Sequence, residues 1–425
     1  MTRLRRATRH TFRSLRVRNY RLFYTGQLVS LSGTWMQYVA QDWLVLRLGG
    51  RGTELGLVTG LQFLPMLVGG PWGGLIADRF DKRRVLLLTQ SAMAGLALVL
   101  GLLVLTDTVT IGMVWVLAFL LGCANLVDVP TRQAFVSEMV GPDEVANAVG
   151  LNSALFNAAR VVGPGLAGVV IATVDVAPTF FLNAASYLGA IVALSAMDPA
   201  RLYRVAPAPR ARGQVREGIR YVWRTPELRF VLGLITVVSL FGMNYRVVLP
   251  LLARFTFNGD VDTYGTMAAV MAAGALAAAL ATAGRGRPTL RLLAALALGF
   301  GVAALAAALA PTLGWELAAL VPTGGAGIAF VATGNSFLQL RSDPAMRGRV
   351  MALYALVFLG SNPIGAPVMG WIAEHWGART ALGLGATVTL VAGLVALVRL
   401  TAPAVAPERR RDELAPAPAL ASANG

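Results

Sequence analysis

Long apolar runs, each close to twenty residues, recur along this chain and are separated mostly by short polar loops. A helix needs about 20 apolar residues to cross the hydrocarbon core of a bilayer. Only helices and closed barrels satisfy their backbone hydrogen bonds inside that core. With 56% hydrophobic and 14% charged residues, the chain is too apolar for an ordinary soluble protein. The runs therefore predict an all-α membrane protein that crosses the bilayer many times.

The runs divide into twelve spans, placed at 22–48, 55–77, 85–105, 111–129, 145–173, 178–197, 230–253, 264–283, 290–310, 315–338, 350–375 and 378–400. One long connection splits them into two halves of six. We expect a basic arm at 1–21, a first half at 22–197, a linker at 198–229, a second half at 230–400 and a disordered cytoplasmic tail at 401–425. Within the linker, Gln214–Arg224 has the pattern of a basic amphipathic helix lying on the membrane surface.

Basic residues account for the formal charge of +16 and set the expected orientation. They gather in the arm and in alternate loops, which is the positive-inside pattern of membrane proteins. Both termini and these loops are therefore expected in the cytoplasm, with the chain in the cell membrane. No soluble stretch is long enough for a separate basic domain, so nucleic-acid binding is not expected. The span after the arm is too long for a signal peptide, so no cleaved signal is predicted.

Few residues suited to covalent or metal chemistry are present. A phosphate-binding loop needs a lysine after a glycine-rich turn, and the only lysine, Lys82, has no such turn before it. The single cysteine, Cys123, and the two histidines, His10 and His375, are far apart, so no metal site is expected. No Ser-His-Asp or paired-carboxylate pattern predicts catalytic residues. We therefore expect neither enzyme activity nor a cofactor.

The two halves repeat each other. A shift of 202 residues aligns span 5 with span 11, and it matches Pro142 with Pro344, Leu151 with Leu353, Phe156 with Phe358, Gly163 with Gly365 and Gly168 with Gly370. A second match sets 29–33 against 238–242 and pairs span 1 with span 7. Several matches at one shift favour a parallel duplication, and hence two pseudo-symmetric six-helix halves.

The turn between spans 2 and 3, residues 73–84 (GGLIADRFDKRR), combines glycines with an Asp-Arg pair and a basic cluster. Glycines such as Gly74 allow a neighbouring helix to approach the backbone of span 2. Asp78 suits the positive end of a helix dipole, where it would accept backbone N–H groups. A plain positive-inside loop is the alternative. The basic side chains expected to fix the orientation and to pair with acidic groups are Arg79, Lys82 and Arg83.

This turn resembles the loop between the second and third helices of the major facilitator superfamily, although Asp81 stands where that family usually has glycine. Five further segments resemble its branch of enterobactin exporters and macrolide efflux proteins: 41–46 (QDWLVL), 128–135 (DVPTRQAF), 147–153 (NAVGLNS), 157–164 (NAARVVGP) and 347–350 (RGRV). The resemblance covers all twelve spans and implies the major facilitator fold. It also implies that Asp78 meets span 11 and helps to close the cytoplasmic side.

Two further groups of residues are candidates for parts of the protein that move during transport. Asp128 and Arg132 lie one helical turn apart near the inner end of span 4. We assign them to the cytoplasmic gate with Asp78, and the substrate cavity is the alternative. In span 5, Gly163 and Pro164 with Gly168 resemble the motif of the family's antiporters, whereas a simple packing kink is the alternative. The second-half loop at 284–287 keeps only basic residues, so the gate is expected mainly in the first half.

Charges inside the spans point to the coupling site, because an ionised side chain in hydrocarbon needs a partner or water. Asp42 lies late in span 1 and Arg246 late in span 7, at comparable depth in helices that line the family's central cavity. We expect them to pair, and we expect Asp42 to take a proton during transport and release Arg246 to the solute. A static salt bridge near the interface is the alternative. The other cavity candidates are Arg160, which is also a gate candidate, Gln37, Asn157 and Asn244.

The function implied by the resemblance is secondary transport by alternating access. We expect a proton-coupled exporter of a small amphiphilic molecule, such as a drug, a siderophore or a secondary metabolite. Import of a polar metabolite, and a non-transporting scaffold or receptor, are the alternatives. The expected partners are the solute, protons and the lipid bilayer, and the chain is expected to act as a monomer.

Overall fold

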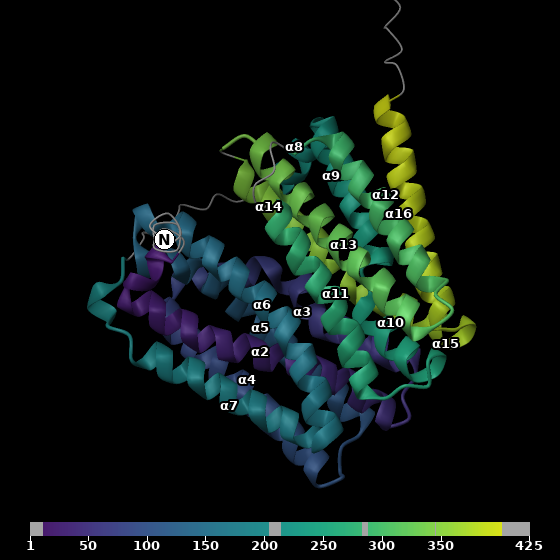
Figure 1. The fold of residues 1–425 in the computed structure, drawn as a ribbon. Helices are drawn as coiled ribbons and strands as arrows, with labels where there is room; N and C mark the ends of the chain where they lie inside the picture. Colours follow the sequence, from purple (N-terminus) through teal and green to yellow (C-terminus); the bar gives the residue numbers. More distant parts are fainter. Residues whose placement is uncertain (1–11, 204–213, 283–287, 345, 402–425) are drawn as a thin grey trace, which may run out of the picture.

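The computed structural model describes residues 12–203, 214–282, 288–344 and 346–401. The first half consists of six helices joined by short turns: α2 (Arg18–Arg47), α3 (Gly52–Arg79), α4 (Lys82–Leu105), α5 (Ile111–Val140), α6 (Val145–Thr173) and α7 (Val176–Ser195) (Figure 1). The arm before residue 12, the tail after 401 and the basic loop at 284–287 lie outside the described residues.

The linker helix predicted at Gln214–Arg224 is α8, with the same bounds. The second half follows it as α9 (Pro226–Val237), α10 (Tyr245–Leu251), α11 (Val261–Thr282), α12 (Leu290–Ala308), α13 (Leu313–Arg341), α14 (Arg347–Gly360), α15 (Asn362–Trp376) and α16 (Ala378–Thr401). An ion pair between Arg349 and Glu217, 2.8 Å long, joins α8 to the start of α14.

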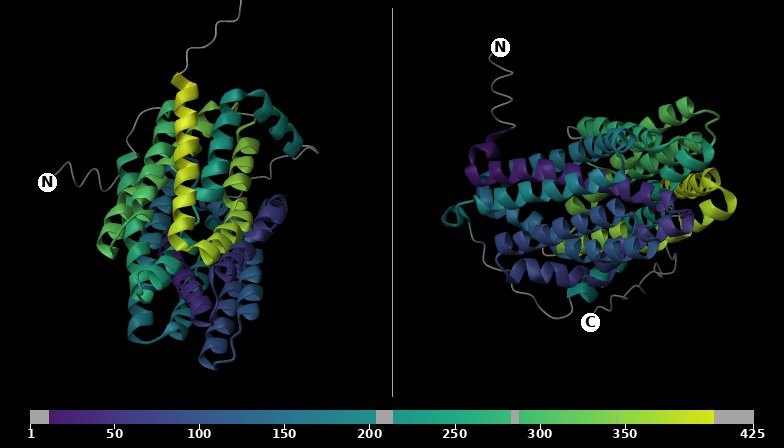
Figure 2. Two further views of the ribbon diagram at one scale, coloured as in Figure 1. Left: turned by 90° about the vertical axis from the view of Figure 1, so that its right-hand side faces the viewer. Right: turned by 90° about the horizontal axis from the view of Figure 1, so that it is seen from below.

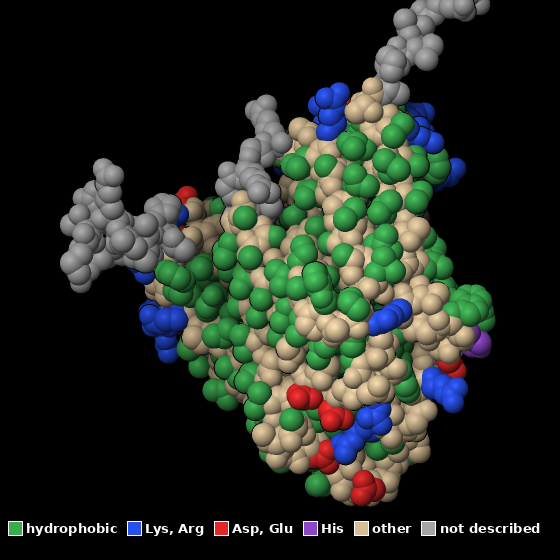
Figure 3. Space-filling model, turned by 45° about the vertical axis from the view of Figure 1, so that its right-hand side comes forward, with side chains coloured by type: hydrophobic (Ala, Val, Ile, Leu, Met, Phe, Trp, Pro, Cys, Tyr) green, Lys and Arg blue, Asp and Glu red, His purple; other side chains and the backbone are tan. Residues whose placement is uncertain are grey.

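Ten helices in the described part of the chain are long and apolar enough to cross a membrane, or eleven when the bent helix α3 is included. α2 has 30 residues but falls outside this set, because polar side chains such as Gln37, Gln41 and Asp42 lower its hydropathy. These helices together are compatible with the twelve predicted spans. Figure 3 shows hydrophobic side chains across the middle of one face and most charged side chains near its ends. This distribution is typical of a protein that crosses the bilayer many times.

Three spans that the sequence predicts as continuous helices are bent or broken. Span 7 contains two π-helical segments, η4 (Val238–Gly242) and η5 (Leu252–Thr256), on either side of α10. Span 11 is divided into α14 and α15, and α15 has a proline in its first turn that lacks a backbone N–H. α3 bends by 67° between Gly70 and Trp72. Breaks of this kind change which way the following side chains project, and π segments recur at functional sites.

Contacts of matched glycines confirm the repeat. Gly163 of α6 packs on the backbone of α2 near Ser32, and its counterpart Gly365 packs on the carbonyl of Leu240 in η4. Gly168 of α6 lies against the start of α11, and its counterpart Gly370 lies against the start of α3. Each half therefore uses the same helix in the same way: one face of span 5 or 11 packs within its own half, and the adjacent face packs against the other half.

The two halves are in close contact at the end of the bundle that holds the start of α3, which we call the Gly52 end. A Cβ atom added to Gly370 would lie 2.1 Å from the carbonyl oxygen of Gly52, and one added to Gly56 would lie 2.5 Å from that of Ala366. Gly265 of α11 approaches α6 in a similar way. Figures 1 and 2 show the two halves joined here, and in Figure 1 they diverge toward the opposite end, which we call the Asp78 end.

We predict that Gly370→Ala weakens this contact. The new methyl group has no space beside Gly52, and overpacking of this kind costs about 1–3 kcal/mol. The midpoint of thermal unfolding of the purified protein in detergent should fall. Gly95→Ala is the matched control, because nothing lies within 4 Å of its Cβ position on α4. Equal midpoints for the two variants would contradict the close contact.

Candidate functional site

A buried carboxylate connects the two halves at the Gly52 end. Asp42, in the penultimate turn of α2, is fully buried. Its Oδ1 accepts a hydrogen bond of 3.0 Å from the guanidinium of Arg246 in α10. Its Oδ2 accepts one of 3.0 Å from the hydroxyl of Tyr264 in α11 and one of 3.4 Å from Nε of Arg246. Both partners belong to the second half, so the charge of Asp42 acts directly across the interface.

The guanidinium of Arg246 has three partners in the first half. Besides Asp42, it donates a hydrogen bond of 3.1 Å to Oε1 of Gln62 in α3. Its Cζ lies 4.3 Å from the ring centroid of Tyr38, one turn before Asp42 on α2, which is within the range of a cation–π contact. The side chain of Arg246 keeps 21% of its exposure, whereas that of Asp42 keeps none. The ion pair is therefore closed on the carboxylate side and partly open on the arginine side.

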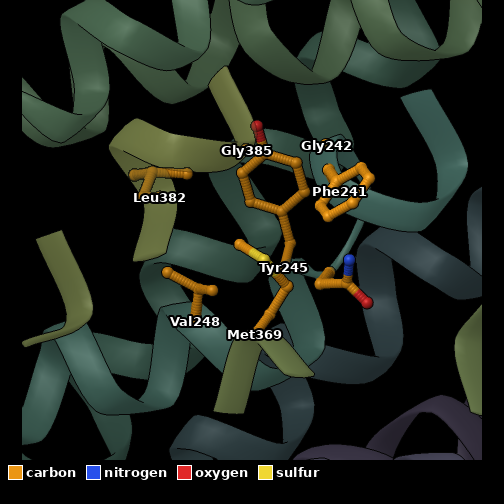
Figure 4. A pocket seen from close by; sticks show the side chains of 8 residues that line it. Phe241, Gly242, Tyr245, Val248, Met369, Leu382 and Gly385 are labelled. Carbon is orange, nitrogen blue, oxygen red and sulfur yellow. The ribbon is translucent and has the colours of Figure 1, made fainter. Parts of the chain in front are cut away.

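The break before α10 sets the position of Arg246. η4 ends at Gly242, and Met243 and Asn244 separate it from the first turn of α10. The amide nitrogen of Asn244 donates to the carbonyl of Leu240, while its oxygen accepts no hydrogen bond from any described residue. A cavity of about 10 Å³ lies beside the break, lined by Phe241, Tyr245 and Met369 among others (Figure 4). That volume suits about one water molecule, so this cavity is not a solute site.

A second buried carboxylate organises the first half. Oδ1 of Asp128 in α5 accepts hydrogen bonds of 2.9 Å each from Thr89 and Gln90 of α4. Its Oδ2 lies 3.5 Å from Nε of Arg132, one turn later on the same helix. Arg132 also donates to Gln27 of α2, at 3.2 Å. These contacts join α2, α4 and α5, which all belong to the first half.

The turn between α3 and α4 is tied to the first half as well. Lys82 forms an ion pair of 2.6 Å with Glu138 of α5. Arg83 donates to the carbonyls of Leu194 and Ser195 at the end of α7, where the helix dipole favours a cation. These contacts bring Lys82 and Arg83 together with helices of their own half.

The glycine-lined end of α3 meets α5. A Cβ atom on Gly73 would lie 2.1 Å from the carbonyl oxygen of Leu126 in α5. Gly74 and Asp78 are half-buried near this end, and Arg79 is exposed. The neighbouring helix that the sequence led us to expect at these glycines is thus α5 of the same half.

The remaining candidates have different surroundings. Gln37 accepts a hydrogen bond of 2.5 Å from Asn183, so its amide faces α7 of the same half and not the ion pair. Arg160 lies on α6, with its Cζ 5.7 Å from the ring centroid of Trp35. Pro164 and Gly168 face α11 at the interface between halves, while Gly163 faces α2. The side chain of Asn157 lies outside the described residues.

The sequence analysis missed Tyr264, which completes the site. It stands at the start of span 8, where an aromatic residue also suits a membrane interface, so its hydroxyl gave no distinct signal. Asn183, Thr89 and Gln90 were missed for the same reason, since single polar residues in apolar runs are common. Among the described residues, no group of three or more His, Cys, Asp or Glu side chains is placed to hold a metal ion.

Comparisons with known proteins agree on the type of protein. The sequence profile described as transmembrane secretion effector matches residues 9–423. The staphyloferrin A transporter of Staphylococcus aureus is 26% identical over 262 residues, which cover 61% of this chain and 65% of that protein. The multidrug efflux pump Tap of Mycolicibacterium fortuitum is 27% identical over 385 residues, 87% of this chain and 93% of that protein.

Among solved structures, a bacterial homologue of the human lysosomal transporter Spinster, in an inward-facing and unoccupied conformation, has a TM-score of 0.67 and 15% identity. The match covers 90% of this chain and 94% of that one. At this identity the likeness concerns the fold, which is the major facilitator fold. The profile match over nearly the whole sequence is more specific: this chain belongs to the transmembrane secretion effector family of multi-pass membrane transporters.

Proposed function

We propose that this protein exports a small amphiphilic solute from the cytoplasm in exchange for protons, and that Asp42 carries the proton. The observation that carries the proposal is the buried Asp42 carboxylate, which receives hydrogen bonds from Arg246 and Tyr264 of the other half. The relative named as a multidrug efflux pump supports the choice of export, and together with the relative named as the staphyloferrin A transporter it supports a small-molecule solute.

Protonation of Asp42 would change the contact between the halves. A charged carboxylate attracts Arg246 strongly in this buried setting, and a neutral carboxyl group does not. Arg246 would then be released, and Tyr264 would lose a charged acceptor. Alternating access requires the contact at the Gly52 end to form and break once in each cycle. Proton binding and movement of the halves are therefore linked, and linkage of this kind is reciprocal.

The orientation follows from charge. The basic residues of the turn between α3 and α4, of α8 and of the α13–α14 connection all lie at the Asp78 end, which we therefore place in the cytoplasm. The closed Gly52 end then faces outward, and the arrangement is an inward-facing one. Both termini would lie on the cytoplasmic side, and the chain would work as a monomer because each half supplies part of the site.

Asp78 would act in the opposite state. When the cytoplasmic side closes, the starts of α4 and α14 approach each other, and Asp78 can accept backbone N–H groups from the first turn of α14. The dipole of that helix favours an anion there. Asp128 and Arg132 would support this gate by holding α4 and α5 together behind it.

The first prediction concerns the proton. Asp42→Asn keeps the size of the side chain but cannot ionise, so transport driven by a pH gradient should fall to the level of empty vesicles. Purified protein in liposomes, with rhodamine 6G and fluorescein as alternative probes and an imposed pH gradient, measures this. Asp175→Asn is the control, because Asp175 also pairs with an arginine, Arg47, but in an exposed loop. Full gradient-driven transport by Asp42→Asn would rule out Asp42 as the proton carrier.

The second prediction concerns direction. Cells that express the protein should accumulate less of at least one of two amphiphilic dyes, cationic rhodamine 6G or anionic fluorescein, than cells with an empty vector, and a proton uncoupler should abolish the difference. Export predicts that intracellular dye rises when the gradient collapses, because the driving force is lost. A fall in dye on uncoupling would indicate import instead.

The third prediction concerns the gate. Asp78→Ala should leave the protein inserted in the membrane but slow transport severalfold, because the cytoplasmic side closes less firmly. Asp143→Ala is the control, since Asp143 is an exposed carboxylate at the same end of the bundle. Both variants should be recovered from membranes in equal amounts. Normal transport by Asp78→Ala would contradict the gating role.

A further inference from the structure

One face of α6 runs along the interface between the halves. Phe156, Arg160, Pro164 and Gly168 are spaced by four residues, so they lie on one side of the helix. The last two are in contact with α11: Gly168 lies beside Gly265, and a Cβ atom on Gly265 would be 3.0 Å from the carbonyl oxygen of Pro164. Arg160 therefore lies one helical turn before this contact with α11, on the side of α6 that faces the second half.

Arg160 is a cation without an anionic partner. Within the described part of the chain, its guanidinium has neither an ion pair nor a hydrogen bond, and its one close contact is the ring of Trp35. By contrast, Arg132 is paired with Asp128, and Arg246 is paired with Asp42. A charge inside a membrane bundle needs a counter-charge, polar groups or water. Because Asp42 already neutralises Arg246, the charge of Arg160 is the one available to bind an anion.

A chain of aromatic contacts begins at the ring that lies against this guanidinium. Trp35 contacts Phe156 and Tyr38 edge to face, with centroids 5.8 Å and 5.6 Å apart. Tyr38 in turn lies under Arg246. On α2, Asp42, Tyr38 and Trp35 occupy successive turns of one face, in the direction away from the Gly52 end. Contacting rings thus link Arg160 to the coupling pair of Asp42 and Arg246.

We propose that Arg160 binds an oxyanion of the transported molecule, a carboxylate or a phosphate, and that Trp35, Tyr38 and Phe156 pack against its apolar part. The substrate is then an amphiphilic anion or zwitterion. This inference rests on the proposed transport function and specifies its substrate class. Guanidinium binds carboxylate and phosphate through paired hydrogen bonds, and its flat face remains available to the indole ring. The rings of Trp35 and Tyr38 would then lie between the bound anion and the pair of Asp42 and Arg246.

Two xanthene dyes of similar size test the charge preference. Fluorescein carries a carboxylate, and rhodamine 6G is a cation with an esterified carboxyl group. In proteoliposomes, the wild-type chain should transport fluorescein, and Arg160→Gln should lower the apparent affinity for fluorescein about tenfold or more. Arg160→Lys should recover part of that loss, because it restores the charge without the paired hydrogen bonds. Arg399→Gln, which removes an exposed charge at the end of α16, is the control and should behave as wild type.

The outcomes separate the possible failures. Fluorescein transport that is equal in Arg160→Gln and wild type, or transport of rhodamine 6G alone, overturns the anion site and leaves the proposed export intact. Transport of neither dye by the wild-type chain contradicts the export proposal itself. The same assay in phosphatidylcholine and in phosphatidylglycerol vesicles distinguishes a solute from a lipid headgroup. If Arg160→Gln changes thermal stability only with phosphatidylglycerol and leaves fluorescein transport unchanged, the oxyanion belongs to a lipid and the solute assignment is wrong.

Discussion

The carboxylate of Asp42 is the point on which the arrangement of the two halves depends. It is fully buried, and the second half supplies its donors, Arg246 and Tyr264. A buried ion pair is a poor source of net stability, because the cost of removing two charges from water offsets their attraction. Removal of one partner, in contrast, leaves an uncompensated charge and costs about 3–5 kcal/mol. The strength of such a contact depends on the charge state of its members. It is therefore better suited to respond to protonation than to stabilise the fold.

Glycines allow the halves to come close enough for that contact. At Gly52 and Gly370 the helix backbones approach to a distance that any side chain would prevent. In a bilayer there is little hydrophobic drive between helices, so close packing of small residues supplies much of the association. Packing of this kind has no directional bonds to break, and the glycine contact therefore resists separation less than a network of hydrogen bonds would. The hydrogen bonds that Asp42 accepts from Arg246 and Tyr264 add directional interactions between the halves.

Much of the fold was predictable because it depends on length and periodicity. The apolar runs, the linker helix Gln214–Arg224 and the repeat at 202 residues all have counterparts in the structure. The pairing of Asp42 with Arg246 was predictable from their depth in the membrane alone, since both residues lie late in spans that run in the same direction. Helix rotation was not predictable in this way. Gln37 turns toward α7 and Gly73 toward α5, and the π segments around α10 could not be told from α-helix by an apolar pattern.

The charges do not follow the repeat, although the glycines do. Gly163 and Gly168 have counterparts in Gly365 and Gly370, which make equivalent contacts. At the same shift of 202, however, Arg160 corresponds to Asn362. At the shift of 209 that aligns spans 1 and 7, Asp42 corresponds to Leu251 and Arg246 to Gln37. Symmetric glycine contacts permit the halves to rock as equivalent bodies about a common interface. A proton and a solute need a single, asymmetric set of charges to act on, and we propose that Asp42, Arg246 and Arg160 form that set.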